Sequence, residues 1–396
     1  MGLKPRLVLH IGTEKTGTTS IQEFLRINAG PYLGKGVVVP TYLGHSNHSL
    51  LPVIAYGDDR HDDLSLAYGL NDPQARTARR EQTIQLLQES AAQHPDHTFV
   101  ISSEHLQSRL TGAEEIDRLH HLLAPIFSSI QIVLYIRKPI DTAISSLSTG
   151  IKCGKTATRI PPPSDPYIEI LCLHRQTVER WAASFGIGAI RVRIFSRQHF
   201  VDGDLLKDFA LMSGIPFDQD LTMPPRTNEK LGFDGLRFLG AINDQIPYIA
   251  DDRFNPLRAN LVTLFETYFC ESPEYAPSEE EINRYAEHYR QSDAWMRERF
   301  FADLPSLWPQ TAARPAAVSA DPQPSLPAAQ GDDAYSPAEV RKLLRLFADA
   351  WNNKQSLINS LRDQLEERNR QIAALNTQLA AGGPTDAAHA EQIRRP

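Results

Sequence analysis

Short runs rich in Val and Ile alternate with longer helical patterns between residue 6 and about residue 305. Such runs, bounded by polar or turn residues, are typical of buried β-strands. Four stand out: "RLVLHIG" at 6–12, "HTFVISSE" at 97–104, "IQIVLYIRKP" at 130–139 and "AIRVRIFS" at 189–196. Between them, apolar residues recur with helical period in "TTSIQEFLRINA", "RREQTIQLLQESAAQ" and "LLKDFALMSG". Alternating strands and helices predict a parallel sheet with helices on both faces, so the expected fold class is α/β, doubly wound.

The pattern changes after residue 308, and the change predicts four parts. Residues 1–308 form one α/β domain. Residues 309–335 are crowded with Pro, Ala, Ser and Gln without a period, which indicates a flexible, partly extended linker. Residues 336–382 predict a coiled-coil-like helix, and 383–396 a disordered tail.

The predicted C-terminal helix carries a heptad seam. Ser336 and Glu339 form a capping box, Pro337 occupies the first helical position, and "GGP" at 382–384 ends the helix. Spacings of four and three alternate along Val340, Leu344, Phe347, Trp351, Lys354, Ile358, Leu361, Leu365, Arg368, Ile372, Leu375 and Leu379. Such a seam favours a homo-oligomer formed through residues 336–382. The alternative is one amphipathic helix lying on its own domain.

Composition narrows the functional classes. The 396-residue chain is 41% hydrophobic, enough for a large core, and its net charge of -7 argues against a nucleic-acid binder. Its three cysteines lack metal-type spacing and are too few for a disulfide framework. The N-terminus lacks the apolar core of a signal peptide, and no run reaches the ~18 apolar residues of a membrane span. A cytoplasmic location without a membrane span is therefore expected.

The first strand leads into a turn suited to binding an anion. In "LVLHIGTEKTGTTSIQEFL", Gly12 and Gly17 have the spacing of a nucleotide-triphosphate loop, but Thr18 stands where that motif needs lysine. The lysine is instead Lys15, inside the turn. Backbone N–H groups and the following helix dipole would face the anion, with Lys15 as a point charge. The Lys-Ser/Thr pair that organises Mg²⁺ is missing. This predicts that the charge on a leaving phosphate is stabilised without a metal ion.

The segment "HIGTEKTGTTSIQ" resembles the phosphosulfate-binding loop of sulfotransferases that use 3'-phosphoadenosine 5'-phosphosulfate (PAPS), closest to the bacterial branch. "VLYIRKPIDTAISS" resembles the family's 3'-phosphate site, with Arg137 at the end of a strand and Ser145 eight positions later. The resemblance covers about residues 5–303. It implies a P-loop-type fold and a PAPS site made of Lys15, Thr16, Gly17, Thr18, Thr19, Arg137 and Ser145.

The resemblance also implies sulfuryl transfer to a hydroxyl or amine, which requires a general base. Glu104 ends the strand at 97–104 and is the first choice. His48, in a loop that commonly borders the acceptor site, is the second, and His105 should point elsewhere. An aromatic residue often stacks on adenine in this family, and Trp181, Phe185 or Phe195 are candidates here. Arg226 is a further candidate for the 3'-phosphate.

Three functional hypotheses follow. The first is a PAPS-dependent sulfotransferase, with catalytic Lys15 and Glu104 or His48, that acts on a carbohydrate or another small hydroxylated acceptor. The second is a catalytically weak sulfotransferase-like scaffold that assembles partners through its C-terminal helix. The third is a P-loop kinase, which Thr18 and the Arg137/Ser145 pair oppose.

Overall fold

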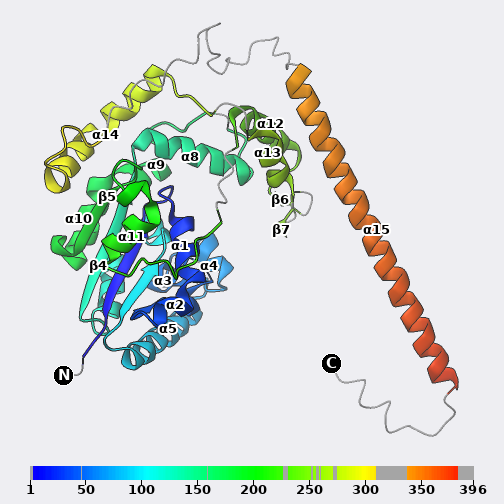
Figure 1. Ribbon diagram of the computed structural model, residues 1–396, viewed down its shortest axis with the longest axis horizontal. Coiled ribbons are helices and arrows are strands. Elements are labelled where there is room, and N and C mark those ends of the chain that lie inside the picture. The colour runs from blue at the N-terminus through cyan, green and yellow to red at the C-terminus, as the bar shows by residue number, and fades with distance from the viewer. Residues whose placement is uncertain are drawn as a thin grey trace. The chain divides into compact units, whose positions relative to one another are not determined.

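The computed structural model describes residues 3–45, 47–157, 159–225, 231–250, 253–255, 258, 260–270, 274–308 and 337–381. The chain divides into two compact units (Figure 1). Unit 1 comprises residues 1–228 and 275–328, and unit 2 comprises residues 229–274 and 329–396. Arg226, Ser336, the predicted linker at 309–335 and the predicted tail at 383–396 lie outside the described residues.

Unit 1 is built on a five-stranded, all-parallel sheet with strand order β2-β3-β1-β4-β5. The strands are β1 (Arg6–Gly12), β2 (Val37–Val38), β3 (Thr98–Ser102), β4 (Ser129–Ile136) and β5 (Ile190–Ile194). The four predicted strands are confirmed, and so is the α/β class with a parallel sheet between helices. The edge strand β2 was not predicted, because two paired residues are too short to produce a periodic signal.

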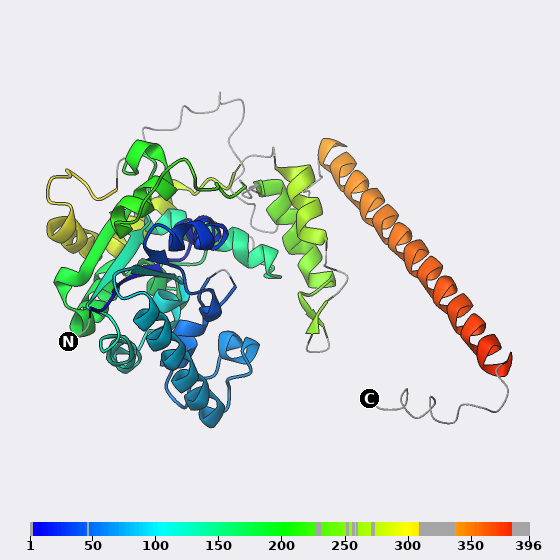
Figure 2. The same ribbon diagram turned by 60° about the horizontal axis from the view of Figure 1, so that its bottom comes forward.

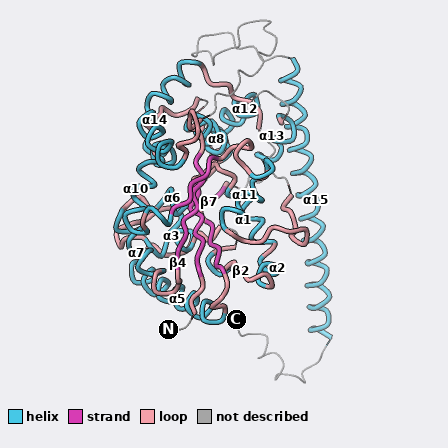
Figure 3. The backbone as a smooth tube through the Cα atoms, turned by 60° about the vertical axis from the view of Figure 1, so that its left-hand side comes forward, coloured by secondary structure: helices cyan, strands magenta, loops and turns pink. Residues whose placement is uncertain are grey.

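Alternation along β1 assigns its side chains to two cores. Leu7, Leu9 and Ile11 pack on one face of the sheet, whereas Val8 packs on the other. The first face is covered by α3 (Leu50–Ala55), α5 (Pro73–Gln93), α7 (Ala113–Leu123) and α10 (His174–Phe185). The second face is covered by α1 (Thr18–Ile27), α2 (Ala29–Leu33) and α11 (Leu205–Ser213). Figure 3 shows the magenta strands between these two layers of helices.

Short helices complete the connections of unit 1. They are the 3₁₀-helices η1 (Thr41–Leu43), η2 (Ile187–Ala189) and η3 (Val201–Gly203), and the α-helices α4 (Asp63–Ala67), α6 (His105–Arg109), α8 (Pro139–Lys152) and α9 (Pro166–Cys172). None of the helices in the described part of the chain is long and apolar enough to cross a membrane.

The strand order places a topological switch point between β1 and β4. The chain leaves β1 toward β2 and β3, whereas it leaves β4 toward β5 on the opposite side. Connections that diverge in this way open a crevice at the carboxyl ends of the two strands, where open α/β sheets bind ligands. Residues 13–17 and Arg137, which follow β1 and β4, lie at this edge.

Helix α14 (Glu279–Phe300) packs against α8 and α10 within unit 1. Ser278 begins it with a capping box. On its inner side, the Asp293 carboxylate accepts a 2.6 Å hydrogen bond from Nε1 of Trp308 through Oδ2. Its Oδ1 is buried and has no hydrogen-bond partner among the described residues. Burial raises the pKa of Asp293 to about 7, and the Trp308 hydrogen bond opposes that rise only in part.

Unit 2 contains α12 (Phe233–Gln245), the antiparallel pair β6 (Ile249–Ala250) and β7 (Arg253–Phe254), α13 (Leu261–Phe269) and α15 (Pro337–Ala381). Gly235 allows α12 to approach α13 closely, because a Cβ there would overlap Leu231 and lie 2.7 Å from the Cβ of Phe269. Figure 2 shows α15 as one uninterrupted helix of 45 residues. It starts at Pro337, the predicted first helical residue.

Contacts group residues 229–274 with the C-terminal helix rather than with the remainder of 1–308. Helix α12 and helix α13 therefore belong to the same compact unit as α15. The four-part division into 1–308, 309–335, 336–382 and 383–396 stays a prediction.

We expect Asp293→Asn to remove a pH dependence of unfolding. The folded pKa is about 7 against an ordinary value of 3.8, so the folded state holds the proton longer. The contribution of Asp293 is present below pH 4 and is lost as the pH rises toward 7, by up to ~4 kcal/mol. Urea unfolding at pH 5 and pH 8 measures the free energy of unfolding of both proteins. Relative to wild type, Asp293→Asn should be more stable at pH 8 than at pH 5. Parallel pH profiles would show that the carboxyl group is ionised throughout.

Candidate functional site

The loop between β1 and α1 is a tight turn built on positive backbone angles. Lys15 has φ 67° and Gly17, the residue that caps α1, has φ 72°. A Cβ at position 17 would overlap the Leu205 side chain and lie 3.0 Å from the Phe195 ring. Glycine is therefore required there, both by its backbone conformation and by its neighbours. The turn aims the start of α1 at the carboxyl edge of the sheet, which is the geometry of an anion site.

Hydrogen bonds within the loop fix its path. The backbone N–H of Thr13 donates to the carbonyl of Tyr135 on β4 at 2.9 Å. The buried Thr16 donates its hydroxyl to the carbonyl of Thr13 at 2.6 Å. Thr18 is buried and Thr19 is exposed at the start of α1. Thr16 thus holds the turn together in this structure, whereas Thr19 has its side chain at the surface.

Arg137 joins the end of β4 to the same loop. Its Nη1 donates to the carbonyl oxygen of Lys15 at 2.9 Å, and its guanidinium lies over the Phe195 ring at 5.6 Å. Its own carbonyl accepts a 3.0 Å hydrogen bond from Nε2 of the buried His174. The guanidinium is therefore held at the edge where the switch point opens.

Lys15 reaches from the loop to α8. Its Nζ donates to the hydroxyl of Thr149 at 2.8 Å. Ser145 lies four residues earlier on α8, so the two hydroxyl-bearing residues share one face of that helix. The predicted residues Lys15 and Arg137 are thus brought together around the carboxyl ends of β1 and β4, and Ser145 lies one helical turn before the Thr149 that Lys15 contacts. Thr149 was not predicted, although its i+4 relation to Ser145 is readable in the sequence.

Burial and neighbouring charges set the protonation of Lys15. Burial lowers the pKa of its ammonium, and the nearby Arg137 lowers it slightly further. The carboxylates of Glu14 and Glu104 act in the opposite direction, as does Cys153. The ammonium therefore lies among charges of both signs, in a region with little water to screen them.

Glu104 follows β3 and precedes α6. Its carboxylate accepts a 2.5 Å hydrogen bond from the side-chain amide of Gln22 on α1. A Cβ at Gly12 would lie only 3.2 Å from the backbone of Glu104, so the glycine at the end of β1 lets β3 deliver this carboxylate next to the loop. Glu104 is half-buried and lies close enough to Lys15 for their charges to interact.

His48 has a different environment. It is buried, and its Nδ1 lies 3.0 Å from the backbone nitrogen and 3.2 Å from the carbonyl oxygen of Ser102, so the tautomer decides whether it accepts from the one or donates to the other. Burial lowers its pKa to about 4, which leaves the ring neutral near pH 7. The ring is thus buried with its Nδ1 against the backbone of Ser102, which is unfavourable for taking a proton from a substrate.

Two further residues at the loop were not predicted. The hydroxyl of Tyr167 on α9 donates to the Glu14 carboxylate, and burial, then Glu14, raises the pKa of this phenol. Arg109 at the end of α6 interacts electrostatically with Glu14 and Tyr167. These contacts join segments far apart in the chain, so no local sequence pattern announces them.

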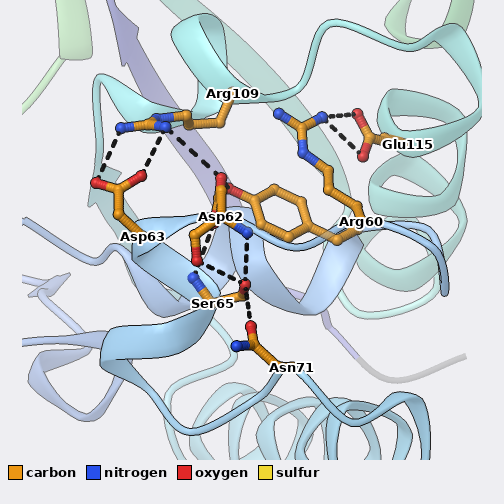
Figure 4. Close-up of polar contacts among 8 residues, drawn as sticks. Arg60, Asp62, Asp63, Ser65, Asn71, Arg109 and Glu115 are labelled. Carbon is orange, nitrogen blue, oxygen red and sulfur yellow. Dashed lines mark hydrogen bonds and ion pairs between the residues drawn. The ribbon is translucent and has the colours of Figure 1, made fainter. Parts of the chain in front are cut away.

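Arg109 belongs to a network of ion pairs and hydrogen bonds (Figure 4). Its guanidinium binds both carboxylate oxygens of Asp63, at 2.9 and 3.3 Å. Asp62 caps α4 through Ser65 and accepts a 2.9 Å hydrogen bond from Tyr56. Beside it, Arg60 forms a bidentate pair with Glu115 and lies 4.5 Å from the centre of the Tyr56 ring. Arg109 is thus positioned by the two carboxylates at the start of α4.

The three aromatic candidates for adenine stacking separate in the structure. Trp181 is buried and stacks on Phe185 inside the core of the first sheet face. Phe195 instead follows β5, beside Gly17 and under Arg137. Of the three, Phe195 is the one next to the loop.

His105 is half-buried after Glu104, and its Nδ1 has no hydrogen-bond partner in the described part of the chain.

Among the described residues, the group with suitable spacing for a metal ion is Asp117, His120 and His121 on α7. Helix α7 ends just before the start of β4, so this group lies at the edge of the sheet opposite the loop. It includes no residue of the loop or of the Arg137 site.

No family model matches the chain, and no curated protein matches its sequence. Solved structures similar to it include a sulfotransferase from Alicyclobacillus acidocaldarius, with 16% identity over 60% of this chain and 93% of that one, at a TM-score of 0.32. A sulfotransferase domain from the curacin biosynthetic pathway has 12% identity over 73% of this chain and 99% of that one, at 0.34. The PezAT toxin-antitoxin system of Streptococcus pneumoniae has 13% identity over 67% and 85%, at 0.29. Similarity this distant carries no argument about activity, which has to come from the site itself.

Proposed function

We propose that the protein is a sulfotransferase that moves the sulfuryl group of PAPS to a hydroxyl or amine of a carbohydrate or another small acceptor. One observation carries the proposal. The ammonium of Lys15 and the guanidinium of Arg137 are held around one loop at the switch point, the guanidinium by a hydrogen bond to the loop backbone.

The donor would bind through both of its phosphate ends. The 5'-phosphosulfate faces the start of α1, where backbone N–H groups, Lys15 and the hydroxyls of Thr18 and Thr19 offer donors. The 3'-phosphate binds Arg137 and the hydroxyl of Ser145 on α8. Of the three aromatic candidates for adenine, Phe195 is the one beside Gly17 and Arg137, and it would stack on the base.

The reaction is an in-line displacement at sulfur. The acceptor oxygen forms a bond to sulfur while the bond from sulfur to the 5'-phosphate oxygen breaks, releasing 3',5'-ADP. Negative charge grows on the departing phosphate, and the Lys15 ammonium stabilises it at close range. In the resting structure Lys15 donates to Thr149, so it would exchange this partner for the phosphate as the donor binds.

Glu104 takes the acceptor proton. It is a half-buried carboxylate beside the loop, oriented by Gln22, and has a second oxygen available for the acceptor. His48 is the weaker choice, because it is buried and its Nδ1 lies against the backbone of Ser102. Glu14, Tyr167 and Arg109 line the remaining side and would contact the acceptor or position it.

The alternatives make different demands on the nucleotide. A P-loop kinase should prefer ATP and require Mg²⁺, whereas the loop here has Thr18 at the lysine position. A scaffold with a weak site would bind 3',5'-ADP without turnover. Titration of 3',5'-ADP, ADP and ATP, followed by transfer assays with ³⁵S-labelled PAPS in EDTA, separates the three.

We expect Arg137→Ala to weaken 3',5'-ADP binding about tenfold or more and to leave 5'-AMP binding nearly unchanged, because a charge-assisted hydrogen bond contributes roughly 1.5–3 kcal/mol. Isothermal titration measures both ligands. Arg290→Ala is the matched control, since that arginine is paired with Glu287 at the surface of α14 and has no part in the candidate site. An equal loss for both nucleotides would place the 3'-phosphate elsewhere.

We expect Lys15→Ala to lower kcat by roughly a hundredfold or more, with a smaller effect on the affinity for 3',5'-ADP, because the ammonium acts mainly on charge that develops during transfer. Lys35→Ala, which removes a lysine paired with Asp218 at the surface, serves as control. Activity within threefold of wild type would reject the role of Lys15.

We expect Glu104→Gln to lower kcat by about 10²–10⁴-fold while leaving nucleotide affinity intact, because the amide keeps the shape of the carboxylate but cannot accept a proton. His48→Gln should retain turnover if the variant folds, as judged by circular dichroism. The reverse ranking of these two variants would make His48 the base and Glu104 a structural carboxylate.

A further inference from the structure

One side of α15 exposes a continuous apolar stripe. Phe347, Trp351, Ile358, Leu361, Leu365 and Ile372 are each about half exposed or more. With Lys354 and Arg368, also exposed, they repeat at alternating spacings of four and three. We call these eight residues the seam. Helical spacing places them along one side of α15, as in a coiled coil.

The packing of α15 inside unit 2 uses the other side of the helix. Leu346 is fully buried, Asp349 accepts a hydrogen bond from the hydroxyl of Tyr268, and the Lys342 ammonium lies 5.7 Å from the centre of the Phe269 ring. At about 100° per residue, Lys342 and Asp349 lie nearly opposite the midpoint between Phe347 and Trp351, and Leu346 lies about 100° from Phe347. Helix α13 therefore occupies the far side and leaves the seam uncovered by any of the described residues of unit 2.

The positions flanking the seam are almost uncharged. On one side they are Ala350, Leu357, Gln364 and Gln371, and on the other they include Ala348, Arg362 and Asn369. The acidic residues Asp363, Glu366 and Glu367 lie further round the helix. A partner helix of opposite charge would find little to pair with along these flanks, whereas a second copy of α15 meets no like-charge repulsion there.

The two cations in the seam decide the orientation of such a pair. In a parallel pair in register, Lys354 would face Lys354 of the second copy, and Arg368 would face Arg368. Both are like-charge contacts in a buried core. In an antiparallel pair with Ile358 opposite Leu361 of the second copy, every described seam position finds a different neighbour.

The antiparallel register is complementary over its whole length. Phe347 lies opposite Ile372 of the second copy, Lys354 opposite Leu365, and Trp351 opposite Arg368. Arg368 then places its guanidinium against the indole of Trp351, a favourable cation–π contact. Lys354 can extend its ammonium past Leu365 to water. Each cation thus faces an aromatic or aliphatic group instead of its own copy.

We propose that two copies of the protein associate through α15 as an antiparallel coiled coil, with Trp351 of each copy packed on Arg368 of the other. Pairing hides the apolar stripe, which an isolated helix would leave in water. The assembly would hold two copies of unit 1. It does not depend on the proposed sulfuryl transfer, because no residue of the loop or of the Arg137 site takes part.

Sedimentation of the full chain tests the association. We expect a dimer at micromolar concentration. Leu361→Glu should give a monomer, because two carboxylates would enter the seam. Ser360→Glu, with the same change one residue away on the outer side, should stay dimeric. A monomeric wild-type chain, or a dimer that survives Leu361→Glu, would overturn the proposal.

Cross-linking tests the orientation without disrupting the helix. In a background with Cys153→Ser and Cys270→Ser, the single variants Lys354→Cys and Leu365→Cys are mixed, allowed to exchange and oxidised. The antiparallel pair predicts a disulfide mainly between the two different chains. Efficient linking of Lys354→Cys with itself would instead show a parallel pair and overturn the Trp351–Arg368 contact.

Discussion

The hydrogen bond from the Arg137 guanidinium to the carbonyl oxygen of Lys15 ties the end of β4 to the loop that follows β1. The candidate site depends on this connection. It exists because β1 and β4 are parallel neighbours, so that their carboxyl ends meet at one edge of the sheet. Thr13, which donates to the carbonyl of Tyr135, makes a second tie between the same two strands. A turn and an arginine separated by more than a hundred residues thereby meet at one edge of the sheet.

The balance of charge around this region explains why it contains acidic as well as basic side chains. Lys15 is buried enough for its pKa to fall, and Arg137 adds like charge beside it. Glu14 and Glu104 oppose both effects. Each carboxylate has a neutral donor of its own, Tyr167 for Glu14 and Gln22 for Glu104. The arrangement keeps a cation next to the loop and leaves a carboxylate near it, as the proposed proton removal and phosphate departure would both require.

The two sides of the C-terminal helix α15 have different roles. One side of α15 packs on α13 through Leu346, Asp349 and Lys342. The opposite side presents the seam. Because a helix can serve two neighbours on opposite sides, attachment to unit 2 and association with a second chain do not compete.

The amino-acid sequence alone determined the elements whose signals are local. The strands at β1, β3, β4 and β5, the turn containing Lys15 and Gly17, Arg137 at the end of a strand and the periodic seam can all be read from neighbouring residues. Buried strands, tight turns and long helices each impose a short-range pattern. The strand β2 could not be predicted, since its two residues are too few to show such a pattern.

Only the tertiary structure decided which distant side chains meet. It brought Thr149 to Lys15, Tyr167 to Glu14, and Gln22 to Glu104. It separated Phe195, beside the loop, from Trp181, inside the core. It also distinguished Glu104 from His48, which is buried with its Nδ1 bonded to backbone. Residue types and spacings are the same whether a histidine is buried or exposed, so these choices rest on packing between elements that are far apart in the chain.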